Sequence, residues 1–231
     1  NQPTLQPNAG PDQTLCSQTD ATLQGNDPGA LNGQWTQIAG PAAGVSIANP
    51  SSPTTTVTGL AGGNTYTFRW TIFGAAPCSN LSDDVALSDL SPITNTISST
   101  STTVCAGTTV HLDGSTSTGG NGFYIDLWEQ STDNGITWTT LTGQTGKSAT
   151  AVVTTNVLFR RTVYSGGCNA VSNQLPIATQ ASLDKNSIAS TTTEVCNSTA
   201  PGLIIGSTPT GGDGTYFYQW QQSPDGSAFT R

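Results

Sequence analysis

Charged side chains are scarce in this 231-residue sequence, because Asp, Glu, Lys and Arg make up 9% of it, whereas ordinary soluble domains contain roughly 25%. Methionine is absent and histidine occurs once. No segment reaches the roughly 18 consecutive apolar residues of a transmembrane helix. The 6 basic residues are outnumbered by 14 acidic ones, which gives a net charge of −8. This sign is wrong for holding a phosphate backbone, so nucleic acid is not an expected partner.

The sequence repeats itself with an offset of 91 residues between its best copies. The segment Asn95–Cys105 (NTISSTSTTVC) aligns without a gap to Asn186–Cys196 (NSIASTTTEVC). Further on, GGNGFYIDLWEQSTDNG, which begins at Gly119, aligns to GGDGTYFYQWQQSPDG, which begins at Gly211. A more divergent earlier copy contains TYTFRWTIFGAAPCSN, which corresponds to VLFRRTVYSGGCNAVSN in the second copy. A fixed period of this size predicts tandem structural units.

The copies divide the chain into three predicted units, which are residues 1–91, 92–181 and 182–231. The third unit contains only the N-terminal half of a repeat, and its sequence stops soon after Trp220. We expect its second half to lie in a continuing parent chain, with the next cysteine about 63 residues after Cys196 by analogy with Cys105 and Cys168. The alternative is that another chain supplies the missing strands by β-augmentation.

Within each unit, short alternating segments bounded by Gly, Asn, Asp, Ser or Pro predict strands. In the second unit they are residues 108–113, 123–130, 157–164 and 174–178. Threonine is abundant and favours strands, and no segment has a sustained helical period. We therefore predict an all-β fold of tandem immunoglobulin-like sandwiches arranged head to tail as a rod. Trp35, Trp128 and Trp220 are expected in the core of the third strand of each unit, and Trp70 in a core or an interface.

These motifs resemble repeat modules of very large secreted proteins in Bacteroidota. The first unit, with AGPDQTLC, WTQIAGPAAGVSI and VTGLAGGNTYTFRWTI, resembles PKD-like and REJ-like modules. The other units, with VCAGTTVHLDGS, LFRRTVYSGGC and SNQLPI, resemble the immunoglobulin-like repeats of the same proteins, including gliding-motility adhesins of the SprB type. The resemblance implies export, commonly through the type IX system, and a secreted, extracellular or cell-surface location.

The five cysteines predict disulfide chemistry, because no CxxC or histidine-bearing cluster provides the usual spacing of a zinc site. The simplest pairing is within units, Cys16 with Cys78 and Cys105 with Cys168. In immunoglobulin topology, however, the two cysteines of one unit lie at opposite poles, too far apart for a bridge. The favoured pairing is therefore between units, Cys16 with Cys168, with Cys78, Cys105 and Cys196 bridging to units or strands outside this sequence. The within-unit pairing remains the alternative.

The sequence contains few residues that could form a catalytic site. His111 is expected on the outer face of its strand, where no neighbouring carboxylate and nucleophile are indicated for a triad. Asp126 and Glu129 share one predicted strand, and Asp83 and Asp84 are expected in a loop, so neither pair predicts the carboxylates of a glycosidase cleft. We expect no catalytic residues and no enzyme activity.

Two kinds of ligand are considered. Trp138 and Tyr124 could form a stacking platform for sugars. Clustered carboxylates could bind calcium between units, although no DxDxDG motif occurs; these residues are Asp12, Asp20, Asp27, Asp83 and Asp84. No cofactor and no metal site are otherwise expected.

The function predicted from the sequence is that of a non-catalytic structural segment of an extracellular adhesin or filament, which provides reach and mechanical continuity. Its expected partners are further repeats of the same chain, other copies in a fibre, and surface glycans or polysaccharides. The alternatives are a carbohydrate-binding adhesin module and the spacer of a secreted polysaccharide-degrading enzyme.

Overall fold

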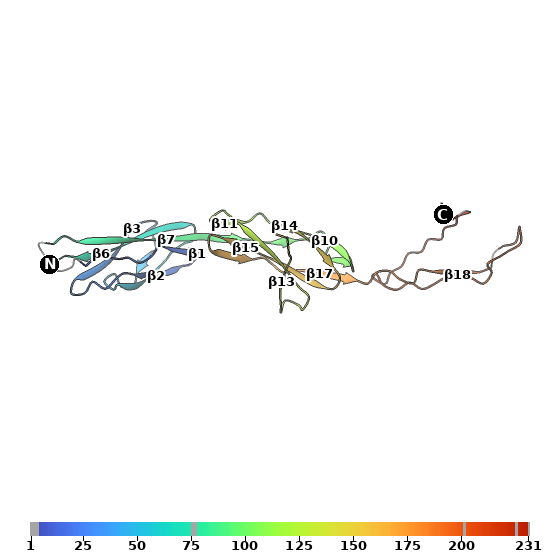
Figure 1. Ribbon diagram of the computed structural model, residues 1–231, viewed down its shortest axis with the longest axis horizontal. Helices are drawn as coiled ribbons and strands as arrows, with labels where there is room; N and C mark the ends of the chain where they lie inside the picture. The colour runs from blue at the N-terminus through green and yellow to red at the C-terminus, as the bar shows by residue number, and fades with distance from the viewer. Residues whose placement is uncertain (1–4, 75–77, 201, 225, 231) are drawn as a thin grey trace.

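The computed structural model describes residues 5–74, 78–200, 202–224 and 226–230. Figure 1 shows two β-sandwiches joined end to end, followed by a thin extended segment that carries the C-terminus away from the N-terminus. All regular elements of the described residues are strands, and no helix suited to crossing a membrane occurs among them. The chain therefore has the elongated, all-β arrangement expected from its repeats.

The first sandwich packs two sheets against each other. One has the strand order β1-β7-β6-β3, and the other has the order β2-β5-β4. The bounds are β1 Gln13–Cys16, β2 Asp20–Gln24, β3 Asn32–Ala39, β4 Ser46–Ile47, β5 Thr54–Thr58, β6 Asn64–Phe73 and β7 Leu81–Thr94. β1 runs parallel to β7, whereas the other paired strands of this sandwich are antiparallel.

Strict alternation along these strands forms the first core. In β2, Ala21 and Leu23 are buried while their neighbours are exposed, as a half-buried strand requires. Trp35 and Trp70 lie opposite each other on β3 and β6, with ring centroids 5.1 Å apart. Both are almost fully buried, and a Cβ at Gly33 would collide with the Trp70 ring. The glycine is therefore needed to leave room for the indole.

The second sandwich repeats this design. Its sheets have the orders β13-β12-β15-β17-β9 and β14-β10-β8, and β16 also pairs with β15. The bounds are β8 Ile97–Ser98, β9 Thr103–Cys105, β10 Thr108–Gly114, β11 Thr118–Gly120, β12 Ile125–Ser131, β13 Thr139–Thr140, β14 Ser148–Val153, β15 Val157–Ser165, β16 Cys168–Val171 and β17 Leu175–Gln180. The four strands predicted in this unit correspond to β10, β12, β15 and β17.

The core of the second sandwich contains Trp128, which is fully buried and donates its indole N–H to the carbonyl oxygen of Gly146 at 2.8 Å. Phe159 of β15 and Leu112 of β10 pack into the same core. Arg161 follows Phe159 by two residues on the same face of β15, so it also points inward, and it is only 1% exposed. A buried guanidinium at this position was not predicted.

Among the described residues after 181, the regular strands are β18 (Ile188–Ser190) and β19 (Ile204–Gly206), which pair with each other, and two isolated bridges join Asp184 to Thr210 and Gln222 to Thr230. Trp220, expected in a core, is 55% exposed. The expected burial is not found within the described residues: Ile188 of β18 and Gly206 of β19 line the groove beside the indole, but no described strand lies beside Trp220 as β15 lies beside Trp128. The expected boundary after residue 91 also falls inside β7, which continues to Thr94.

Candidate functional site

The joint between the two sandwiches is built around β7, which belongs to both. Its first part pairs with β6 and β1 of the first sandwich, from Leu81 to Leu90. Its last part pairs with β11, where Ser91 lies opposite Gly120 and Thr94 opposite Thr118. The two threonine hydroxyls are 2.7 Å apart and hydrogen-bond each other. The connection is consequently a hydrogen-bonded strand, not a free linker.

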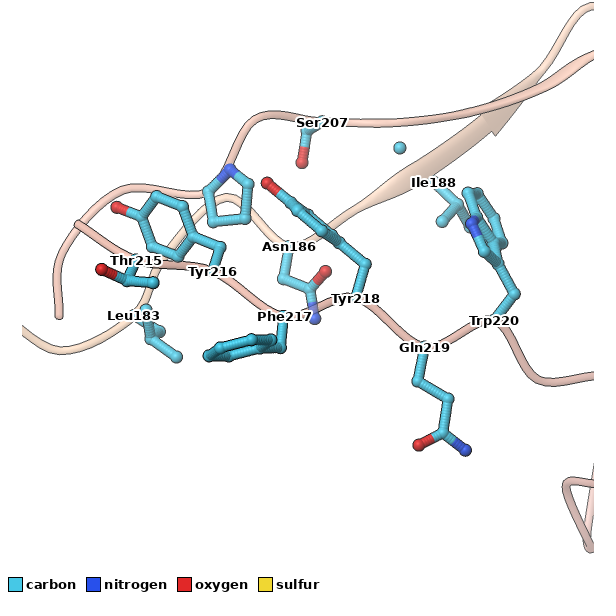
Figure 2. Close-up of a pocket in the computed structure, with 12 residues that line it drawn as sticks. Leu183, Asn186, Ile188, Ser207, Thr215, Tyr216, Phe217, Tyr218, Gln219 and Trp220 are labelled. Atoms are coloured by element: carbon cyan, nitrogen blue, oxygen red, sulfur yellow. The ribbon is translucent and has the colours of Figure 1, made fainter. Parts of the chain in front are cut away.

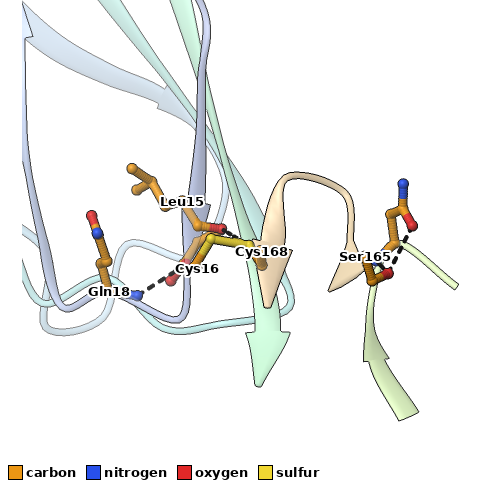
Figure 3. The surroundings of a disulfide bond; sticks show 7 residues. Leu15, Cys16, Gln18, Ser165 and Cys168 are labelled. Carbon is orange, nitrogen blue, oxygen red and sulfur yellow. Dashed lines mark hydrogen bonds between the residues drawn. A yellow bond between two sulfur atoms is a disulfide. The ribbon is translucent and has the colours of Figure 1, made fainter. Parts of the chain in front are cut away.

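A disulfide between Cys16 and Cys168 crosses the same joint (Figure 3). Cys16 ends β1 of the first sandwich and Cys168 begins β16 of the second, 152 residues later, with their Cα atoms 5.6 Å apart. This is the favoured inter-unit pairing. The within-unit alternative is absent, since Cys78 and Cys105 are exposed free thiols. Cys168 pairs with Ser165 at the end of β15, whereas Cys105 pairs with Gln180 of β17, beyond the start of β15, so the two cysteines lie at opposite ends of the second sandwich.

The turn between β15 and β16 packs directly on the shared strand. A Cβ at Gly166 would lie 2.6 Å from Leu90 Cδ1, so this contact leaves no room for a larger residue. Ser165 Oγ accepts the Asn121 backbone N–H at 3.0 Å and hydrogen-bonds the Asn121 side chain at 2.9 Å. Tyr124 donates its hydroxyl to the carbonyl oxygen of Gly119 at 2.7 Å. Together these contacts fix β11 and the turn against β7.

A buried carboxylate supports the cysteine on the first-sandwich side. Asp89 of β7 is 1% exposed and lies opposite Leu15 in the parallel pair of β1 and β7. Its Oδ1 accepts the backbone N–H of Gln18 at 3.1 Å. Ser17, between them, adopts a left-handed φ of 55°. Asp89 therefore fixes the turn after Cys16, a role that no sequence pattern indicates, because a lone Asp is usually exposed.

Arg161 ties the end of the joint to the second core. Its guanidinium donates to Asn95 Oδ1 at 2.9 Å, to Ser115 O at 2.9 Å and to Lys147 O at 3.2 Å. Asp126 lies 3.7 Å away. Burial lowers the pKa of Arg161, while the charge of Asp126 raises it. The side chain thus exchanges water for a set of fixed acceptors.

Asn95, directly after β7, completes this network from the other direction. Its side-chain NH₂ donates to the carbonyl oxygens of Arg161 at 2.7 Å and Ala170 at 2.9 Å. The residue that follows the shared strand is therefore bonded to both β15 and β16. The contacts of the joint therefore extend from the disulfide, through Asn95, to Arg161 in the second sandwich.

The residues considered for catalysis do not share one site. His111 is exposed, and its Nε2 is 3.1 Å from Asp113 Oδ1. Glu129 forms an ion pair with Arg160 at 2.8 Å, separately from Asp126 beside Arg161. Asp83 and Asp84 lie in β7 and not in a loop as expected, because the strand begins at Leu81.

The acidic residues considered for calcium are engaged individually. Asp83 accepts the Ala9 backbone N–H, and Asp84 receives two hydrogen bonds from Arg69 at 2.7 and 2.8 Å, which lower its pKa. Asp12 accepts from the backbone of Ala86; Asp27 accepts from that of Gly29 and Asp20 is bonded to the Thr19 hydroxyl. Among the described residues, no three His, Cys, Asp or Glu side chains gather as metal ligands would.

The two aromatic residues considered for sugar binding are not brought together. Tyr124 immediately precedes β12, whereas Trp138 immediately precedes β13, which pairs with the opposite end of β12 at Gln130. Six strand residues separate these points by about 20 Å. The guanidinium of Arg160 also covers one face of Trp138, 4.1 Å from the ring centroid.

Trp138 is held by a turn whose key residue is Asp133. Its carboxylate accepts hydrogen bonds from the Thr137 backbone N–H at 2.9 Å and from the Ser131 hydroxyl at 2.7 Å. The Thr137 hydroxyl donates as well, and these bonds lower the pKa of Asp133 from 3.8 to about 2. Hydrogen bonds to the charged form are the main cause, and they outweigh a smaller opposite effect of desolvation.

The turn is accordingly expected to resist acid. A folded-state pKa below the unfolded value means that the stabilisation is complete above pH 4 and is lost as the pH falls through about 2. In an NMR titration we expect the Asp133 carboxyl to change near pH 2, together with the Thr137 amide. Asp133→Asn should remove this acid transition and loosen Trp138 at neutral pH. A midpoint near 4 would contradict the hydrogen-bond network.

Comparison with known proteins supports the architecture. Residues 9–85 match the family model described as K319L-like, PKD domain, and residues 93–181 match a model described as Domain of unknown function (DUF8696). No curated protein matches the chain. Extracellular domains 3–5 of Drosophila OTK superpose with a TM-score of 0.50 at 8% identity, over 75% of this chain and 60% of that one. Titin domains I67–I69 give a TM-score of 0.49 at 12% identity, over 99% and 80%.

The chain consists of tandem immunoglobulin-like sandwiches, as predicted. The first of them is PKD-like by the family match. At these identities the structural likeness shows the fold alone, and the chain spans less than two thirds of the OTK fragment. The assignment of function therefore depends on the joint itself.

Proposed function

We propose that this chain is a non-catalytic structural segment of an extracellular, cell-surface adhesin or filament, in which stapled immunoglobulin-like repeats provide reach and mechanical continuity. The resemblance to SprB-type repeat modules extends the proposal to surface filaments secreted by the type IX system and used in gliding motility. Further repeats of the same chain are the proposed immediate partners.

The double attachment at the joint is the observation that carries this proposal. Domains joined by one linker bend and rotate relative to each other by default. Here the strand β7 makes one connection and the Cys16–Cys168 bridge makes a second, at a separate point of the same interface. Two attachments remove most rotations that one would permit. A joint of this kind transmits force and preserves length, which a spacer or filament requires.

The start of the next joint supports an array of such units. Beyond the second sandwich, Asp184 pairs with Thr210, and the Gly212 N–H donates to Ala181 O at 2.8 Å. The Tyr216 hydroxyl donates to Gly211 O at 2.8 Å, as Tyr124 does to Gly119 at 2.7 Å. We therefore infer that residues 182–231 begin a third repeat, attached as the second is attached to the first.

Chemistry of the bridge supports an extracellular location. Structural disulfides persist in oxidising compartments and are rare in the reducing cytosol. The few charged groups and the net charge of −8 also suit a rod that stays apart from anionic surfaces. Antibody labelling of intact source cells, with a cytosolic protein as the negative marker, tests this location directly. Labelling only after permeabilisation would contradict it.

Removal of the bridge tests the mechanical proposal. In the double variant Cys16→Ser with Cys168→Ser, we expect the distance distribution from small-angle X-ray scattering to broaden and the maximum dimension of the molecule to decrease. The free energy of unfolding should fall by about 2 to 4 kcal/mol, because the bridge no longer restricts the unfolded chain. The matched control is Cys78→Ser, which removes an exposed free thiol.

Reduction of the native chain with dithiothreitol should reproduce the effect of the double variant and should leave that variant unchanged. A scattering curve that is identical before and after reduction would mean that the pairing of β7 with β11 alone determines the angle between the two sandwiches. The bridge would then have no mechanical role.

A further inference from the structure

An open groove of about 410 Å³ runs along the segment that follows the second sandwich (Figure 2). Asn186, Ile188 and Ser207 line one side of it, and Tyr218 and Trp220 line the other. Trp220 is 55% exposed and Tyr218 is 64% exposed. Large aromatic side chains so exposed on one side of an extended segment indicate a surface that a partner covers.

The second sandwich shows what covers the corresponding surface there. Strand β15 lies antiparallel to β12, and its Arg161 stands opposite Trp128 in the register. The Arg161 guanidinium carbon is 5.7 Å from the Trp128 ring centroid. Asn95 Oδ1 and Ser115 O accept its hydrogen bonds at 2.9 Å. A Cβ at Gly114 would collide with the guanidinium, so a glycine is required beside it.

The groove preserves these groups at the equivalent positions of the repeat. Trp128 corresponds to Trp220, Asn95 to Asn186, Ser115 to Ser207 and Gly114 to Gly206. All four of the later residues line the groove.

The backbone around the groove is equivalent as well. The Ser187 N–H donates to Ser207 Oγ at 2.9 Å and the Ser207 N–H to Ser187 O at 2.8 Å. In the second sandwich the corresponding distances, between Thr96 and Ser115, are 3.0 and 2.8 Å.

One group differs, because Tyr218 replaces Asp126. The carboxylate is the most distant of the polar groups around Arg161, at 3.7 Å and without a hydrogen bond. An aromatic face also attracts a guanidinium. This substitution therefore preserves the preference for a planar cation.

The first sandwich provides an internal comparison, because Trp70 takes the position of Arg161 there, opposite Trp35. The Asn26 N–H donates to Asn8 O at 2.9 Å, as Ser115 does to Thr96. The residue equivalent to Asn95 is consequently Pro7, which has no side-chain acceptor. An asparagine thus accompanies the arginine and a proline accompanies the tryptophan. Since the third copy has Asn186, its groove fits an arginine.

We propose that this groove binds an antiparallel β-strand of the same polypeptide, the counterpart of β15, whose arginine lies on Trp220 and hydrogen-bonds Asn186. The return of the chain supports this source, since Gln222 pairs with Thr230 as Gln130 pairs with Thr139 in the second sandwich. The inference rests on the third repeat proposed above and adds the identity of its buried cation.

The test extends the intact 231-residue chain. Since Thr140 aligns to Arg231, a second copy of residues 141–180 is joined directly after Arg231. Hydrogen exchange at Ile188–Ser190 and Ile204–Gly206, which differ in sequence from their counterparts, reports on the third unit alone. In the extended chain we expect at least a tenfold increase in protection at these strands. We also expect acrylamide to quench the tryptophan fluorescence less than in the unextended chain, and this difference should be absent in Trp220→Phe.

Two substitutions in the appended copy then isolate the arginine. Arg161→Leu there should reduce the gained protection at least tenfold, since the bonds to a charged donor are lost. Arg160→Leu there is the matched control and should change the protection far less, because Arg160 lies nearer the surface and its ion-pair partner Glu129 is replaced by Gln221 in the third copy. Asn186→Leu should act like the arginine variant, and the two together should be no worse than either.

The outcomes separate the proposals. Protection that appears but ignores the Arg161→Leu change would overturn the arginine site and leave the third repeat intact. No protection on extension would overturn the repeat and the arginine site together. If the unextended chain dimerises in sedimentation and thereby shields Trp220, the occupant is a second copy, and assignment to the same polypeptide is overturned.

Discussion

Arg161→Leu should destabilise the second sandwich by about 3 to 5 kcal/mol, the range for removing one partner of a buried charged network. The leucine would fill much of the volume, but Asn95 Oδ1 and the carbonyl oxygen of Ser115 would lose their donors. Asp126, whose side chain is 14% exposed, would lose its neighbouring cation. Unfolding of the second core, followed by hydrogen exchange of peptides from β12 and β15, measures this change.

Arg160→Leu is the matched control on the adjacent residue of the same strand. The Arg160 side chain is 26% exposed, against 1% for Arg161, and water can replace part of its ion pair with Glu129 and its contact with the Trp138 ring, so we expect a loss of about 1 kcal/mol. Equal effects of the two substitutions would contradict the buried network as the source of stability.

Trp128→Ala should cost about 3 to 5 kcal/mol, because the substitution leaves a large cavity in a closely packed interior. The indole is fully buried and its N–H is bonded to Gly146 O, so water cannot replace it without disrupting both sheets. The expected result is a strong decrease in the denaturation midpoint of the second sandwich. Exchange protection in the first sandwich, whose core is separate, should change little.

Trp138→Ala provides the comparison for that prediction. This indole lies on the β12–β13 turn, partly exposed beneath Arg160, and we expect a loss of about 1 kcal/mol or less. A loss as large as that of Trp128→Ala would mean that the turn contributes to the core.

The period and alternation of the sequence were sufficient to predict the sandwiches and the core positions of Trp35 and Trp128. The same alternation contains a signal for Arg161, since Val157, Phe159 and Val163 share its strand face and are buried. The aligned copies FRWT and FRRT also put Trp70 and Arg161 at one position. Charge usually indicates exposure, and only the acceptors around the guanidinium reverse that rule.

Other features depend on tertiary contacts that no local pattern encodes. The continuation of β7 to Thr94 requires β11 as a partner, and β11 contains two glycines that do not by themselves favour a strand. The burial of Asp89 follows from the turn after Cys16. Trp220 follows the sequence pattern of Trp128 but is 55% exposed, because its burial depends on a neighbouring strand such as β15, which lies beside Trp128. The Cys16–Cys168 bridge could be predicted from the sequence because immunoglobulin strand order places the two cysteines of one unit at opposite ends of that unit.

Strand order also determines how each sandwich bears a load. In the first sandwich the first strand, β1, runs parallel to the last strand, β7, and in the second sandwich β9, which follows the short β8, runs parallel to the last strand, β17. When the chain is pulled from its two ends, such a pair slides along its own length, so its hydrogen bonds are strained together in shear. Antiparallel terminal strands would instead separate one bond at a time, like a zip. Cys16 lies at the end of β1, and its bridge enters the next unit there. Tension can therefore pass to the neighbouring repeat before the parallel pair is required to yield.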